Sequence, residues 1–165
     1  MKKLIFLLTL VSFQSCAVKY SFTGTSIDPE IKSVSIAYFE SVAPLAKPTL
    51  SQVFTEGLKD RFIQQTNLSL VKTQGDIQFS GKIVDYQTRP VAIQGNETAA
   101  LNRLTISMEV EFVNLKDDTK NFKQKFSRFQ DYSAGQSLSS VEDNLIEQIN
   151  EQLIQDIFNK SVSDW

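Results

Sequence analysis

The chain has 165 residues, with 17 basic and 19 acidic side chains, a net charge of −2 and no histidine. This length fits one ordinary domain, and the mildly acidic balance argues against a nucleic-acid partner, which favours a strongly basic face. The absence of histidine excludes Ser-His-Asp and Cys-His catalysis and the usual zinc sites. An enzyme is therefore the weakest of the functional hypotheses, and we expect no cofactor and no catalytic or metal-binding residues.

The first residues predict export. Lys2 and Lys3 precede an apolar run over residues 4–11, and small or polar residues connect this run to Cys16. This order is typical of a secretory signal, and the run is far shorter than the roughly 20 residues that a transmembrane helix needs. We therefore expect residues 1–15 to be a signal peptide and residues 16–32 to be a tether with a first extended segment.

Cys16 is the only cysteine of the chain, so it has no intramolecular partner. The segment Phe13-Gln14-Ser15-Cys16 resembles a lipobox, although Phe13 stands where Leu is usual, and this resemblance implies lipid attachment at the Cys16 sulfur. Several acyl chains on one cysteine would hold the chain stably at a membrane. The alternative is a buried or incidental thiol. After cleavage the chain would keep 15 basic and 19 acidic residues, a net charge of −4.

Residues 33–165 predict a single α+β domain. Alternating apolar residues at 34, 36 and 38 indicate a strand, and Thr49 with Gln52 predicts a capping box at the start of a helix that ends before Asn67. Residues 68–71 and 77–83 predict two further strands, with a bulge near Val84 and Tyr86 and a long polar loop over residues 89–100. The apolar face expected for the helix comprises Leu50, Val53, Phe54, Leu58 and Phe62.

The second half of the chain predicts a hairpin followed by a helix. Residues 105–112 alternate strictly between apolar and polar side chains, a turn follows at Asp117 and Asp118, and residues 122–126 return with one wet face. Ser139 and Glu142 predict a second capping box. The apolar stripe of this helix comprises Val141, Leu145, Ile149, Leu153 and Ile157, widened by Ile146, Ile154 and Phe158. The whole pattern predicts a two-layer α+β sandwich, with two amphipathic helices on one face of a mostly antiparallel sheet of four to five strands.

Two groups of charged residues are candidates for chemistry or binding. Glu109 and Glu111 lie two residues apart on a strand, as a catalytic carboxylate pair can, but a solvated face is the preferred interpretation. Basic residues between the middle loop and the last strand could contact phosphates, or they could guard an exposed sheet edge against aggregation. The phosphate candidates are Arg103, Lys116, Lys120, Lys123 and Lys125.

Four stretches of the chain resemble the LptE family of lipopolysaccharide-assembly lipoproteins. They are YSFTGTSIDPE after the cysteine, the helix PTLSQVFTEGLKDRF, the strand region TNLSLVKTQGDIQFSGKIVDY, and the closing helix. The resemblance implies two helices on a mostly antiparallel sheet. It also implies a non-enzymatic plug in the lumen of the outer-membrane β-barrel LptD, which helps that barrel to assemble and to pass lipopolysaccharide to the outer leaflet.

The resemblance further implies an outer-membrane location, with the lipid-anchored chain facing the periplasm and the barrel lumen. Ala17 is consistent with this location, because some bacteria retain lipoproteins at the inner membrane through an Asp at that position. The alternative function is a periplasmic lipid-binding carrier lipoprotein, whose apolar cavity the 12 phenylalanines would line. A solid core between helices and sheet would argue against the carrier.

Overall fold

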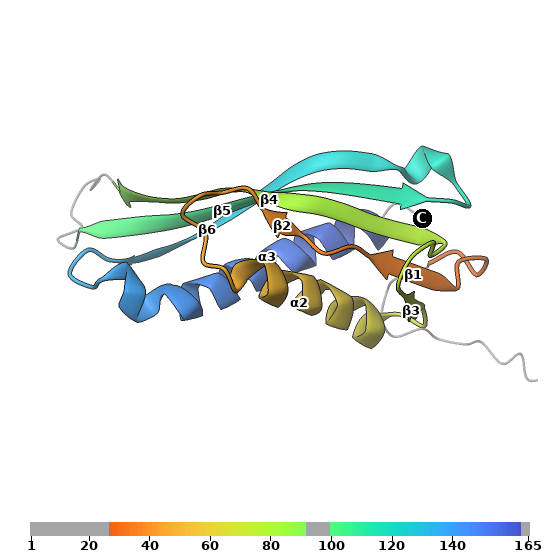
Figure 1. Ribbon diagram of the computed structural model, residues 1–165, viewed down its shortest axis with the longest axis horizontal. Coiled ribbons are helices and arrows are strands. Elements are labelled where there is room, and N and C mark those ends of the chain that lie inside the picture. Colours follow the sequence, from red (N-terminus) through yellow and green to blue (C-terminus); the bar gives the residue numbers. More distant parts are fainter. Residues whose placement is uncertain (1–26, 92–99, 163–165) are drawn as a thin grey trace, which may run out of the picture.

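The computed structural model describes residues 27–91 and 100–162, which fold as helices on one side of a sheet (Figure 1). The elements in chain order are β1 (Ser33–Ile36), β2 (Glu40–Ser41), α2 (Leu50–Gln65), β3 (Ser69–Val71), β4 (Ile77–Val91), β5 (Leu101–Asn114), the short 3-10 helix η1 (Asp118–Lys120), β6 (Phe122–Ser133) and α3 (Leu138–Val162). The predicted α+β sandwich is confirmed. The sheet has six strands, because the two-residue strand β2 joins it.

The sheet combines a long antiparallel part with a shorter parallel part. Its order is β3-β1-β4-β5-β6, with β2 also beside β4. The long pairings β4–β5 and β5–β6 are antiparallel, whereas β1 pairs in parallel with β3 and β4, and β2 pairs in parallel with β4. Most of the ladder is therefore antiparallel, as predicted.

Phenylalanine rings fill the space between the helices and the sheet. The Phe62 ring of α2 lies 4.9 Å from that of Phe79 on β4 and 5.0 Å from that of Phe158 on α3, centroid to centroid, and Phe79 lies 4.9 Å from Phe112 on β5. All four rings are buried. The alternating apolar residues of β5 meet this cluster from the sheet side, and they are Leu104, Ile106, Met108, Val110 and Phe112. The phenylalanines thus form a packed core.

Helix α2 differs from the prediction at its first turn and on its face. The buried face repeats every four residues as Leu50, Phe54, Leu58 and Phe62. Val53 is 48% exposed, so its assignment to this face was wrong: it lies to the side of that series. The predicted capping box is also wrong, because Thr49 already has helical backbone angles and its side chain makes no capping hydrogen bond.

Helix α3 buries the predicted stripe, with Val141 half-buried at its start. Its predicted capping box is not formed, because the helix begins at Leu138, before Ser139. The carboxylate of Glu142 accepts a hydrogen bond from the hydroxyl of Tyr86 on β4 and is not turned back to the helix start. Burial and this carboxylate raise the pKa of the Tyr86 phenol. No helix in the described ranges is long and apolar enough to cross a membrane.

The middle strands are longer than predicted. The expected bulge is confirmed by a register shift between Ile83 and Asp85. The loop expected from residue 89 was wrong at its start, because residues 89–91 still pair with residues 101–103. The rest of that loop lies mostly outside the described residues. The hairpin has the predicted wet face except at Ser107, which is 2% exposed and donates a hydrogen bond to Ser127.

Candidate functional site

The hairpin of β5 and β6 separates the predicted basic residues into groups. Lys116 precedes η1 and Lys120 is the last residue of η1, at the turn of the hairpin. Lys123 and Lys125 follow on the outer face of β6, opposite Glu111 and Glu109 of β5. Arg103 lies near the start of β5, eleven residues before Asn114, which is roughly 35 Å along an extended strand. The structure therefore does not gather the five candidates into one cluster.

Arg103 is occupied by neighbours on β6. Its guanidinium donates two hydrogen bonds to the carboxylate of Asp131, at 2.7 and 2.8 Å, and lies 3.6 Å from the ring centroid of Phe129. The two-fold hydrogen bond raises the pKa of Arg103 and lowers the pKa of Asp131. A bidentate pair stacked on an aromatic ring is a well-ordered arrangement for arginine. Two of the five N–H donors of Arg103 are therefore already used within the protein.

Lysines and glutamates alternate on the outer face of the sheet. Lys123 lies 3.7 Å from the carboxylate of Glu111, and Lys82 of β4 lies 3.6 Å from that of Glu109. These residues border a shallow hollow of about 250 Å³. Each carboxylate faces a lysine, which agrees with the interpretation of Glu109 and Glu111 as a solvated, charge-balanced face.

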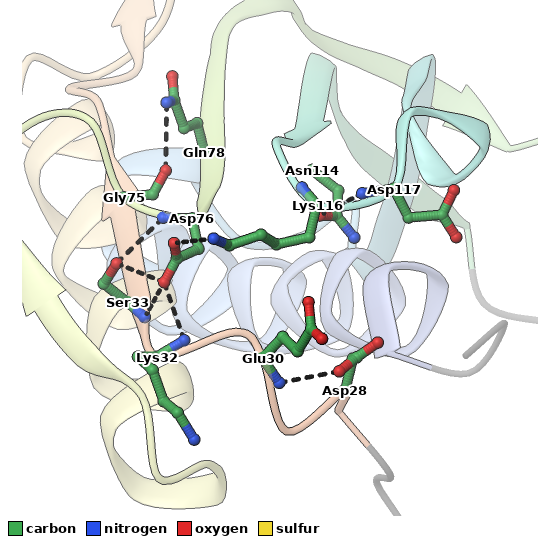
Figure 2. A network of polar contacts seen from close by, with 10 residues as sticks. All are labelled: Asp28, Glu30, Lys32, Ser33, Gly75, Asp76, Gln78, Asn114, Lys116 and Asp117. Carbon is green, nitrogen blue, oxygen red and sulfur yellow. Dashed lines mark hydrogen bonds and ion pairs between the residues drawn. The ribbon is translucent and has the colours of Figure 1, made fainter.

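Asp76 is the centre of a polar network at the end of the molecule where the described chain begins (Figure 2). Its Oδ2 accepts hydrogen bonds from the backbone N–H groups of Lys32, at 2.9 Å, and of Ser33, at 3.0 Å, and from the Ser33 hydroxyl at 2.9 Å. Its Oδ1 lies 3.6 Å from the ammonium of Lys116. The hydrogen bonds from Lys32 and Ser33 lower the pKa of the Asp76 carboxyl. Asp76 thus holds together the start of β1, the start of β4 and the turn after β5.

Asn114 lies beside this network and is fully buried. Its Oδ1 accepts hydrogen bonds from the backbone N–H groups of Lys116, at 2.8 Å, and Asp117, at 3.1 Å, and its own backbone N–H donates to the side chain of Asn121. Its Nδ2 has no hydrogen-bond partner among the residues that the structure describes. An unpaired buried amide donor is costly, so a bound acceptor would stabilise this position.

A hollow of about 250 Å³ connects these groups. Its wall combines Ile27 and Ile31 of the first described segment with Asn114, and its rim carries Lys116 and Lys120 beside two carboxylates, Asp28 and Asp117. The lysines and the amide can donate hydrogen bonds to an anionic oxygen, while the carboxylates limit how much negative charge the site accepts. Of the five predicted basic residues, this candidate site brings together Lys116 and Lys120.

Sequence reasoning missed Asp76 and Asn114. Both lie at strand ends, where polar residues predict turns. Their partners are distant in sequence or hidden in backbone groups, so no local spacing marks them. Cys16 lies outside the described residues. Within those residues no group of three or more His, Cys, Asp or Glu could hold a metal ion.

The fold and its surface define a class: a small α+β sandwich with one sheet face covered by two helices and the other charged and open to solvent. The family model LptE, described as lipopolysaccharide-assembly, matches residues 31–161. Because this match covers most of the chain, the protein belongs to the LptE family. Membership confirms the resemblance seen in the sequence and supports a role in lipopolysaccharide assembly.

Two solved structures that are similar to this chain share its fold at low sequence identity. The hypothetical protein CT253 of Chlamydia trachomatis is 12% identical, with a TM-score of 0.51 over 79% of this chain and 95% of that chain. Protein XCC0632 of Xanthomonas campestris is 7% identical, with a TM-score of 0.51 over 81% and 87%. Rare lipoprotein B of Shewanella oneidensis is 12% identical, with a TM-score of 0.45 over 78% and 90%. The comparison with curated proteins finds no match.

Proposed function

We propose that this protein is a lipid-anchored outer-membrane lipoprotein that lies in the lumen of an LptD-type β-barrel and supports lipopolysaccharide transport and insertion without catalysing a reaction. The family match over residues 31–161 is the observation that carries this proposal. The plug is the role that the family resemblance implies. The alternating lysines and glutamates on the outer sheet face are compatible with it, because the lumen of a large barrel is polar.

In this proposal the anchor is Cys16, acylated after removal of residues 1–15. Ile27 follows Cys16 by eleven positions along the chain, so the described body can stand at most about 35 to 40 Å from the lipid. The Asp76 network fastens residues 32 and 33 to the body. The end of the body that carries Lys116 and Lys120 is therefore the end that is nearest to the anchor along the chain.

We assign Lys116 and Lys120 to the phosphate groups of lipopolysaccharide. They share a hollow with the buried amide of Asn114, whose Nδ2 has no partner among the described residues. Lys123 and Lys125 follow on β6 outside this hollow, where they lie opposite Glu111 and Glu109, so they contribute less. Arg103 contributes least, because Asp131 and Phe129 already hold its guanidinium.

The packed core makes the lipid-carrier alternative the weaker one. A carrier would hold an acyl chain between helices and sheet, but there the rings of Phe62, Phe79, Phe112 and Phe158 contact one another. An acyl chain could enter only by displacing these buried side chains, and such cores are closely packed.

Affinity purification of the tagged full-length chain from detergent-solubilised membranes tests the function. We expect a β-barrel protein and lipopolysaccharide to co-purify, and we expect depletion of the chain to reduce both assembled barrel and surface lipopolysaccharide. The variant Cys16→Ala should no longer incorporate a labelled fatty acid, whereas the wild type should. If depletion left barrel assembly and surface lipopolysaccharide unchanged, the assembly role would be wrong.

A further inference from the structure

Strand β6 has a free edge that lacks several devices by which proteins block strand pairing. No strand of the described part of the chain lies on its outer side. Its twelve residues pair with β5 without any register shift, and they include neither proline nor glycine. Proteins commonly protect edges with short strands, bulges or proline. β6 has none of these devices, because it is long, has no bulge and contains no proline.

The opposite open edge of the long hairpin is protected. β1 and β2 pair with β4 only as far as Ile83, so the later residues of β4 also have an uncovered side. There a bulge follows Ile83, and Pro90 removes a backbone donor. The contrast between the two edges singles out β6 as the edge suited to pairing.

Charged side chains are a further means of protecting an edge, but on β6 most of them are drawn to other parts of the molecule. Three of its charged residues form ion pairs across the sheet or with α3. These pairs are Lys123–Glu111 at 3.7 Å, Asp131–Arg103 at 2.7 Å and Arg128–Asp156 at 2.5 Å. Lys123 and Asp131 are therefore drawn towards β5, whereas the Arg128–Asp156 pair lies between β6 and α3 and its two charges neutralise each other.

A groove follows this edge. It has a volume of about 460 Å³ and lies between β6 and α3 (the two elements are adjacent in Figure 1). Four glutamines line it, Gln130 from β6 and Gln148, Gln152 and Gln155 from α3, together with the charged residues Arg128, Glu151 and Asp156. The three on α3 are spaced by four and three residues, which places them on one side of the helix. The groove is therefore a polar strip parallel to an open ladder.

The glutamine amides match the chemistry of a peptide. A glutamine side chain both donates and accepts hydrogen bonds, as a peptide group and small polar side chains do. Gln130 and Gln152 are half-buried, and neither has a hydrogen-bond partner among the described residues. These two amides are thus held at the groove without a partner, which suits a polar occupant better than an acyl chain.

We propose that the free edge of β6 and the glutamine groove bind an extended, polar segment of the β-barrel partner, which adds to the sheet as a further strand. The backbone of that segment pairs with β6, and its alternate side chains enter the groove. Serine, threonine, asparagine or glutamine at alternate positions is expected, because the groove offers amides. This inference rests on the proposed function and names the surface that meets the barrel.

Two measurements on the full-length lipoprotein, co-expressed with its barrel, test the inference. A photo-cross-linking amino acid at Gln130 or Gln152 should capture an extended polar segment of the barrel protein, while the same probe at Gln52 or Gln64, exposed on α2, should not capture that segment. The double variant Gln130→Ala/Gln152→Ala should weaken barrel association about ten-fold, the loss that one or two hydrogen bonds give. The control is Gln52→Ala/Gln64→Ala, which should bind as the wild type does.

The outcomes separate this inference from the proposed function. If the wild-type complex forms but the groove variant binds like its control, the groove inference is wrong and the proposed function stands. Cross-links from Gln130 or Gln152 to a second copy of the chain, or to its own residues 16–26, would also overturn it. If the wild type forms no complex with a barrel, the proposed function fails first. Circular dichroism and equal melting temperatures of both double variants show that any loss of binding is not a loss of folding.

Discussion

Asp76 shows how one half-buried carboxylate can organise the end of a domain. It accepts three hydrogen bonds from Lys32 and Ser33 and lies beside the ammonium of Lys116, so it joins segments more than 40 residues apart. The hydrogen bonds to the ionised form lower its pKa. The contribution of Asp76 to stability must therefore depend on pH.

In the variant Asp76→Asn, the free energy of unfolding should depend less on pH in the acidic range than it does in the wild type. In the wild type the stabilisation by Asp76 is fully present above pH 3.8, its ordinary pKa, because the carboxylate is ionised in both states. It is lost as the pH falls through the lower pKa of the folded state, because the unfolded chain takes up the proton first. Urea unfolding between pH 2 and pH 7 should show the difference between wild type and variant shrinking towards low pH.

A matched control is Asp60→Asn, an exposed aspartate on α2. It should shift the free energy of unfolding by less than about 0.5 kcal/mol at every pH. A wild-type profile that stayed parallel to that of Asp76→Asn down to pH 2 would contradict the role of the network.

For single residues, the sequence does not predict which side chains bind distant backbone groups. The apolar positions of β5 follow from strict alternation, and they are buried as predicted. Asp76 and Asn114 act through the N–H groups of Lys32, Ser33, Lys116 and Asp117, which depend on how the chain folds back. The sequence identified the basic residues as candidates, but it did not predict which of them lie together. In the structure the length of β5 separates Arg103 from Lys116.

Between the elements, Gly81 of β4 allows a close approach of β5 and of the segment between β1 and β2. A Cβ atom on Gly81 would lie 2.2 Å from the backbone oxygen of Glu109 and 2.5 Å from Cε1 of Phe39. The first contact is with the backbone of β5 and the second is with a buried ring. Neither can move away cheaply, so only glycine fits here.

The variant Gly81→Ala should lower the free energy of unfolding by about 2 kcal/mol or more, because overpacking shifts a neighbouring strand. Gly135→Ala is the control, since its Cβ would have its nearest contact, Ser133 Oγ, at 3.6 Å. That variant should stay within about 0.5 kcal/mol of the wild type. Urea denaturation with a common slope measures both, and equal values for the two variants would show that β4 has room at Gly81.

Element type followed from periodicity, but ends and caps did not. The helices around Phe54 and Ile149 and the hairpin strands were predicted because their apolar spacing continues over many residues. Both capping boxes failed, at Thr49 because the helical conformation begins earlier and at Glu142 because Tyr86 is its partner. The residues 89–91 look like a loop locally, yet they extend β4 because β5 supplies a ladder across from them.

For the whole molecule, the two-layer arrangement followed from the order of elements, whereas the strand order did not. Alternation shows that β1 is a strand, but it does not specify a place between β3 and β4. Parallel pairing with β3 and β4 depends on how α2 crosses the sheet, and the pattern of apolar residues does not predict this crossing.

Replacement of Lys116 and Lys120 by glutamine tests the proposed phosphate contacts. The double variant should weaken binding of purified lipopolysaccharide by roughly 0.5 to 1 kcal/mol for each lysine, or about five- to thirty-fold together. Titration of the purified lipoprotein at fixed salt concentration measures it. Lys59→Gln/Lys72→Gln changes the net charge equally on other surfaces and should have little effect. Equal losses from both double variants would indicate a general charge effect.

The place of β1 in the sheet also means that β1 is synthesised well before the strands with which it pairs. Ser33 to Ile36 are made about 40 residues before their partners in β3 and β4. At typical rates of synthesis, about 5 to 20 residues per second, β1 waits for roughly 2 to 8 s. During that interval Val34 and Ile36, buried in the finished protein, have no strand to pair with. Until β3 and β4 have been made, this segment therefore exposes apolar side chains that the finished protein buries.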